Sequence, residues 1–145
     1  MKTLHTILVS CLILGISCTP KSTQQEKQTA ADNPIESIKF ANAREQIETV
    51  CIVCHSATAM PDKRFAPPLE IAKRNYLAQT ETKQEFVDKM VRFILNPTVE
   101  QSLLHSDVEQ FGVMDPVGFS QEDVTAIAEF IYETNLEKPS WLLDQ

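Results

Sequence analysis

Five residues near the middle of the chain place the strongest constraint on what it can become. Residues 51–55 read CIVCH, so two cysteines three positions apart are followed directly by a histidine. On a helix this spacing brings both thiols onto one turn, with the imidazole next to them. Three kinds of chemistry use such a group: a redox dithiol, a metal site, and the covalent attachment of haem.

The remaining sequence argues against the first two kinds. A thioredoxin-like dithiol follows a strand in a βαβ pattern, which is not seen here. A zinc site would need a fourth ligand and usually a second Cys or His pair, whereas His105 stands alone. A disulfide between Cys51 and Cys54 would close a very small loop and add little stability. Covalent haem attachment uses the residues present, with thioethers from Cys51 and Cys54 and an iron ligand from His55.

The start of the chain has the layout of a secretory signal. Lys2 precedes an apolar run over residues 4–17, shorter than the roughly 20 residues that a membrane-spanning helix needs. The run ends in LGISC, which resembles a bacterial lipobox and predicts lipid attachment to Cys18. An ordinary signal with an incidental cysteine is the alternative, and Cys11 would leave too short an apolar region before the cut. Either signal predicts export.

We therefore expect a lipoprotein-type signal peptide over residues 1–17, and a protein anchored by Cys18 on the periplasmic or cell-surface side of a membrane. Residues 18–33 are polar and nearly free of large apolar side chains, which predicts a flexible tether. Residues 34–145 are then enough for one compact domain. They contain no internal repeat and no second CxxCH motif.

The first helix is predicted to begin at Pro34, with Asn33 as its N-cap and Glu36 three positions after the cap. It is expected to continue into the CIVCH segment. Its apolar face is predicted from residues at helical spacing, namely Phe40, Ala43, Ile47, Val50 and Cys54.

Further helices are predicted along the rest of the chain. A short one covers residues 69–79, and a second starts at the Thr82–Glu85 capping box and stops at Asn96-Pro97. The last starts at a capping box formed by Ser120 and Asp123. No stretch alternates as a strand would, so the fold class expected for the domain is all-α.

In this order of features the sequence resembles the class I mono-haem c-type cytochromes. The likeness covers roughly residues 33–135 and is carried by the helix ending in CIVCH, the APPL loop at 66–69, and the segment MDPVGFSQEDVTAIAEFIYET at 114–134. The family usually has proline directly after the methionine, whereas Asp115 intervenes here before Pro116. The resemblance implies a small helical domain around one covalently bound haem c, with a haem edge exposed for electron exchange.

Met114 is the expected second axial ligand, because it lies in an irregular loop far from His55 in sequence and matches the family position. A thioether there favours reduced iron. Met60 is an alternative, although its reach of about 17 Å would be nearly used up in passing round the porphyrin. His105 is another, but its polar flanks predict a surface residue. Met90 lies in an apolar helical stripe, where methionine more often fills the core.

Charge bears on the partners. Loss of residues 1–17 removes one of 13 basic residues, leaving 12 against 20 acidic ones and a net charge of −8. Seven basic residues fall within 60–92, whereas from residue 93 onward one basic residue faces ten acidic ones. This asymmetry either steers a redox partner or is a merely solvated surface. The overall acidity disfavours nucleic-acid binding.

We therefore expect an electron carrier, and not an enzyme, that moves one electron between a donor and an acceptor among larger redox proteins. With His55 and Met114 on both sides of the iron, no small-molecule substrate is expected. One alternative is a haem enzyme or a gas or redox sensor whose distal site is open. Another is a haem subunit that works only within a dehydrogenase or oxidase complex.

Overall fold

The computed structural model describes residues 33–143 of the chain. The signal peptide, the tether and the lipid attachment at Cys18 fall on residues 1–33, so Cys18 and almost all of these segments lie outside the described residues. All regular structure within 33–143 is helical, which confirms the all-α prediction. None of these helices combines the length and the apolar character that a membrane crossing requires.

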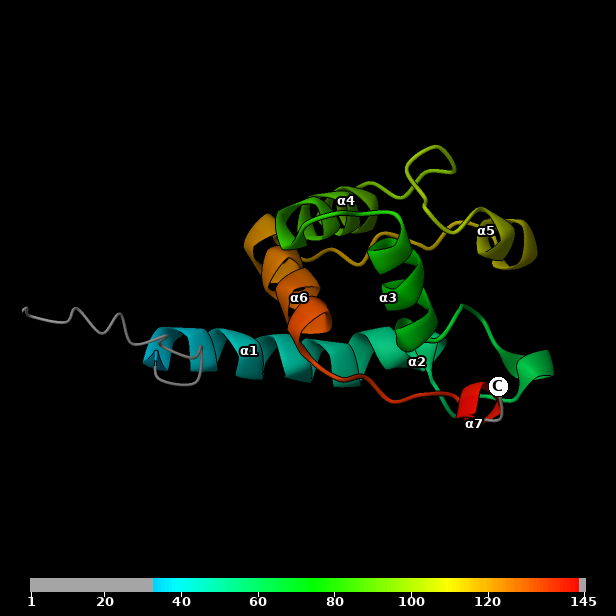
Figure 1. Ribbon diagram of the computed structural model, residues 1–145, viewed down its shortest axis with the longest axis horizontal. Coiled ribbons are helices and arrows are strands. Elements are labelled where there is room, and N and C mark those ends of the chain that lie inside the picture. Colours follow the sequence, from blue (N-terminus) through cyan, green and yellow to red (C-terminus); the bar gives the residue numbers. More distant parts are fainter. Residues whose placement is uncertain (1–32, 144–145) are drawn as a thin grey trace, which may run out of the picture.

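The helices follow one another in a simple order (Figure 1). They are α1 (Pro34–Gln46), a π-helical turn (Ile47–Cys51), α2 (Ile52–His55), a 3₁₀ turn (Pro61–Lys63), α3 (Leu69–Ala78), α4 (Lys83–Leu95), α5 (His105–Phe111), α6 (Gln121–Glu133) and α7 (Ser140–Leu143).

The predicted helix starts are confirmed by their caps. The Asn33 side chain accepts a hydrogen bond from the backbone N–H of Ile35 at 3.1 Å. The hydroxyl of Thr82 accepts from the N–H of Glu85 at 3.1 Å, and that of Ser120 accepts from the N–H of Asp123 at 3.1 Å. Each bond satisfies a donor that the first helical turn leaves without a partner. The capping residues thus set the starts of α1, α4 and α6 locally.

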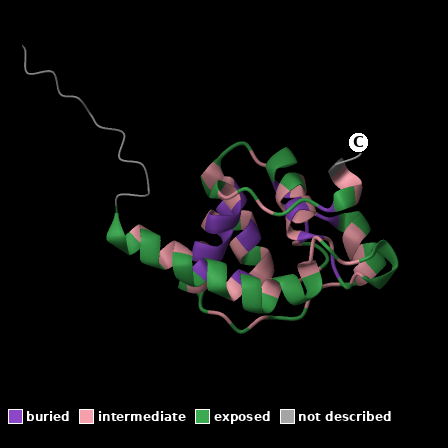
Figure 2. Ribbon diagram, turned by 90° about the horizontal axis from the view of Figure 1, so that it is seen from below, coloured by how far each residue is buried: buried purple, intermediate pink, exposed green. Residues whose placement is uncertain are grey.

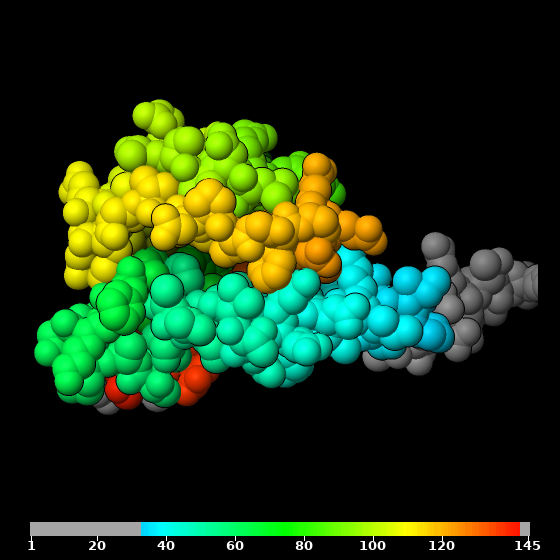
Figure 3. Space-filling view, turned by 180° about the vertical axis from the view of Figure 1, so that it is seen from behind, coloured from blue at the N-terminus to red at the C-terminus, as the bar shows by residue number. Residues whose placement is uncertain are grey.

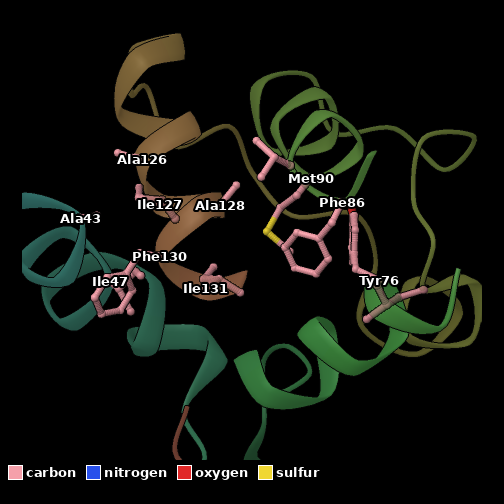
Figure 4. Close-up of a cluster of buried hydrophobic side chains, with 12 residues drawn as sticks. Ala43, Ile47, Tyr76, Phe86, Met90, Ala126, Ile127, Ala128, Phe130 and Ile131 are labelled. Atoms are coloured by element: carbon pink, nitrogen blue, oxygen red, sulfur yellow. The ribbon is translucent and has the colours of Figure 1, made fainter. Parts of the chain in front are cut away.

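A tightly packed core joins three of these helices. Helix α6 packs against both α1 and α4, and α4 also contacts α3. Phe86 of α4 is completely buried, and its ring meets Tyr76 and Tyr132 edge-on with ring centroids 5.7 and 5.2 Å apart. Figure 2 shows the buried positions gathered in the interior of the helical domain, while most of α1 is exposed. Figure 4 shows the side chains of α1, α4 and α6 that meet there.

The π-helical turn corrects the predicted face of the first helix. The N–H of Ile52 bonds to the carbonyl of Ile47, five residues back, so the turn holds one residue more than an α-helical turn. Every later residue is rotated by about 100° from the predicted α-helical position. Val50 is therefore 41% exposed and Cys54 is also exposed, whereas Cys51 packs against the core. Cys51 and His55 take the places predicted for Val50 and Cys54.

Helix α5 was not predicted. Its signal is present in the sequence, since Leu104, Val108 and Phe111 recur at helical spacing. The helix is seven residues long and ends at Gly112, whose φ of +80° favours glycine. His105 at its start is exposed, as its polar flanks predicted.

Candidate functional site

A cavity of about 680 Å³ opens beside the core. Its walls come from the π-helical turn and α2, the loop before α3, helices α3 to α6, and the segment between α5 and α6. In Figure 3 it is the hollow between the yellow α5 segment above and the green loop below. Most of its lining is apolar, with side chains such as Leu69, Phe93, Ile94, Val113 and Ile131. The volume lies within the range of small-molecule and cofactor sites.

All residues of the CIVCH motif predicted to carry chemistry line this cavity. Cys51, Cys54 and His55 lie on one wall, and no disulfide joins the two cysteines. Cys51 is half-buried, and burial raises the pKa of its thiol, while Cys54 is exposed. The π-helical turn explains this arrangement, because it turns Cys51 and His55 inward and leaves Cys54 at the edge.

His55 is held by a contact from the loop that follows it. Its Nδ1 lies 2.6 Å from the carbonyl oxygen of Pro67. Because a carbonyl can only accept, Nδ1 carries the proton, and in the neutral ring Nε2 keeps a free lone pair. Burial lowers the pKa of His55, and the bond to Pro67 offsets part of this effect. The imidazole is therefore neutral at pH 7 and has one nitrogen available as a ligand.

The candidate axial ligands named from the sequence lie in different parts of the structure. Met114 lines the cavity, in the segment between α5 and α6. Met60 is 62% exposed, and neither it nor His105 lines the cavity. Met90 is 5% exposed within the core cluster, which confirms it as a core residue, but it also lines the cavity. The structure therefore makes Met90, and not Met60, the methionine to compare with Met114.

Tyr76 brings a polar group to this apolar wall. It lines the cavity from α3, its side chain is 3% exposed, and its hydroxyl has no hydrogen-bond partner among the described residues. Burial raises the pKa of this phenol, so the hydroxyl stays protonated and is available as a donor. A buried hydroxyl without a partner is costly, and a ligand with an acceptor oxygen would satisfy it.

Charged residues of opposite sign occur in two of the segments that border the cavity. Lys63 and Arg64 belong to the segment between α2 and α3, and Asp107, Glu109 and Asp115 belong to α5 and the segment after it. Asp107 and Asp115 also line the cavity. Burial raises the pKa of Asp107, although the charge of Arg64 acts in the opposite direction. Asp107 was not singled out from the sequence, because nothing local showed that α5 would form a wall of the site.

No protein-family model, curated protein or solved structure matches this sequence. The likeness to class I c-type cytochromes is therefore one of motifs and their order.

Proposed function

We propose that this protein is a c-type cytochrome that carries one electron between larger redox proteins. In this proposal Cys51 and Cys54 hold one haem through thioethers, and His55 and Met114 are the axial ligands. The observation that carries it is the orientation of His55. Its Nδ1–H is donated to Pro67 at 2.6 Å, which leaves Nε2 free on a cavity wall that it shares with both thiols.

The residues around the cavity fit such a group. Haem is a large apolar disc with carboxylates at one edge, and the cavity is large, mostly apolar and about 680 Å³ in volume. Its walls offer a neutral imidazole, two free thiols and the thioethers of Met90 and Met114, which are ligand types found in c-type centres. The unpartnered hydroxyl of Tyr76 is a donor suited to a carboxylate.

When bound, haem supplies a reversible one-electron couple of its iron. The chain's own residues then set how that couple behaves. Pro67 holds the tautomer and the rotation of the His55 ring, as outer hydrogen bonds to ligating histidines do. The neutral thioether of Met114 favours the reduced state, and the apolar walls exclude water from the site.

The carrier role, the partners and the location are part of the same proposal. His55 and Met114 would both hold the iron and would leave no position for a substrate, so the role proposed is exchange of an electron with a donor and an acceptor. The excess of basic residues over 60–92 and of acidic residues from 93 onward is suited to orienting such partners. Export and a lipid anchor at Cys18 place this exchange at a membrane surface outside the cytoplasm.

Covalent attachment tests the proposal directly. The full chain is expressed in a bacterial host with haem-attachment machinery, and haem is extracted with acid acetone. We expect haem to remain with the polypeptide and to add one haem mass to it. The Cys51→Ser/Cys54→Ser double variant is expected to lose covalent haem completely, because no thiol remains in the motif.

The control lies between the two cysteines. Val53 is 70% exposed, so Val53→Ala changes the motif segment without removing a thiol and should retain covalent haem. If haem extracts freely from the wild type while both cysteines react with an alkylating reagent, the proposal is wrong. If haem is covalent but the reduced wild type readily binds carbon monoxide, the distal position is open, and an enzyme or a sensor replaces the carrier.

A further inference from the structure

The chain after α6 returns to the side of the molecule that carries the cavity. Lys73 of α3 donates to the carbonyl of Thr134 at 2.8 Å, which fixes the end of α6. Further on, Pro139 is fully buried, and the N–H of Leu142 bonds back to the Pro139 carbonyl at 2.9 Å. Figures 1 and 3 both show α7 beside the loop that joins α2 to α3. We refer to residues 139–142 as the C-terminal clamp.

The clamp contacts this loop through one pair of side chains. The guanidinium carbon of Arg64 lies 5.2 Å from the centre of the Trp141 ring, a distance at which a cation is attracted to the aromatic face. Both residues are half-buried, and the buried Arg64 Nε and Trp141 Nε1 have no hydrogen-bond partner among the described residues. The charge of Arg64 also acts on Asp107 of the cavity wall. Arg64 thus connects the clamp to the loop that leads to the cavity wall.

The contact between Arg64 and Trp141 matters because of the position of Arg64 in the loop. Arg64 comes three residues before Pro67, whose carbonyl accepts the hydrogen bond from His55. Next to that carbonyl the loop is anchored by Pro68, which is fully buried. Met60 and Phe65, which lie before and after Arg64, are 62% and 76% exposed, whereas Ala66, directly before Pro67, is 7% exposed. Ala66 and Pro68 hold the loop on either side of the carbonyl, and Arg64 ties its exposed part to the clamp.

We propose that Trp141 is a positioning residue for His55. By holding Arg64, the clamp keeps the loop where the Pro67 carbonyl meets the imidazole Nδ1–H. This inference rests on the proposed function, in which His55 Nε2 binds the iron. In that setting the hydrogen bond fixes the rotation of the ring and the basicity of the ligand, so a residue outside the cavity tunes the metal centre through the loop.

The hydrogen bond itself is the quantity to measure. In the reduced holoprotein, nuclear magnetic resonance follows exchange of the His55 Nδ1–H with solvent. Trp141→Ala should make this exchange about tenfold faster, because the cation–π contact that holds Arg64 is lost. Trp141→Phe keeps an aromatic face and should remain close to the wild type. Arg64→Met should match Trp141→Ala, and the double variant should exchange no faster than either single variant.

Leu136→Ala separates positioning from general stability. Leu136 lies in the same C-terminal segment but packs against the core cluster, so its loss should lower the free energy of unfolding without changing exchange at His55. Two results would overturn the role proposed for Trp141 but not the proposed function. One is that exchange of the His55 Nδ1–H becomes equally faster in Leu136→Ala and Trp141→Ala, and the other is that it is unchanged in haem-loaded Trp141→Ala. A wild-type protein without covalent haem would overturn the proposed function and the clamp together.

Discussion

The two sides of this molecule are built differently. On one side α1, α4 and α6 interlock through side chains that are almost completely buried, such as Ala43, Phe86 and Ile127. On the other side α2, the loop after it, α5 and the Met114 segment surround a cavity. Large apolar side chains there remain exposed, as Val53 and Phe65 are.

The difference means that folding and the proposed function depend on different sides of the molecule. Burial of apolar surface drives folding, and most of it occurs on the packed side. The cavity side contributes less packing but holds every residue that the proposed chemistry uses. Substitutions on the two sides should therefore change different quantities, stability on the first and properties of the bound group on the second.

The largest effect is expected on the packed side. Phe86 is completely buried against Tyr76 and Tyr132, so Phe86→Ala should lower the free energy of unfolding by about 3–5 kcal/mol. Met60→Ala, at a 62% exposed position that lies on the cavity side but does not line the cavity, should change it by less than about 0.5 kcal/mol. Denaturant unfolding of the holoprotein measures both. Similar losses in the two variants would show that the sides are not energetically distinct.

The next largest effect is expected from the substitution of Met114, which lies on the cavity side. Met114→Ala should lower the reduction potential on the order of 0.1 V, since axial ligands are the main determinant of haem potentials. It should also abolish the weak long-wavelength band of a sulfur–ferric iron bond and admit carbon monoxide. Met90→Leu is the matched control, because Met90 lines the same cavity but belongs to the core. Loss of the band in Met90→Leu instead would reassign the ligand.

Tyr76 lies where the packed side and the cavity side meet. Whether Tyr76→Phe lowers or raises the stability of the holoprotein shows if its hydroxyl has a partner. If its hydroxyl donates to a carboxylate of the bound group, Tyr76→Phe should destabilise the holoprotein by roughly 1 kcal/mol. Tyr132→Phe is the control, because Tyr132 meets the same Phe86 ring but lines no part of the cavity. A more stable Tyr76→Phe holoprotein would mean that the hydroxyl has no partner even when the site is loaded.

The smallest expected effect concerns pH. Burial raises the pKa of Asp107 above its ordinary value of 3.8, so ionisation of this carboxyl opposes folding at neutral pH. Asp107→Asn should therefore increase the free energy of unfolding at pH 7. The gain should shrink as the pH falls through the raised pKa and vanish below 3.8, where the carboxyl is protonated in both the folded and the unfolded chain. A gain that is independent of pH would show that ionisation is not its cause.

The sequence was most informative where the structure is determined locally. Asn33, Thr82 and Ser120 mark helix starts because each cap bonds to a backbone N–H only two or three residues away. The motif at 51–55 could be located for the same reason. Met114 was selected because it lies in an irregular loop far from His55 in sequence and matches the position in the family that the sequence resembles, and it lines the cavity.

Features that depend on distant contacts were missed. The π-helical turn at Ile47–Cys51 adds one residue that helical periodicity does not show, so the sequence pattern gave Val50 and Cys54 the wrong exposure. Helix α5 is too short to stand out by periodicity, although Leu104, Val108 and Phe111 carry the pattern. The bond between His55 and Pro67 requires a loop of twelve residues to close, which no local pattern reports.

The π-helical turn has a consequence for how the length of this protein can vary. The turn accommodates one extra residue between the packed face of α1 and the CIVCH motif. Deleting a single residue from 48–50 should convert it into an ordinary α-helical turn while His55 keeps its aim at the cavity. A deletion farther upstream, between Phe40 and Ala43, would instead put the packed face of α1 out of step. The turn is thus a point in the first helix at which the loss of one residue leaves both the packed face of α1 and the aim of His55 in place.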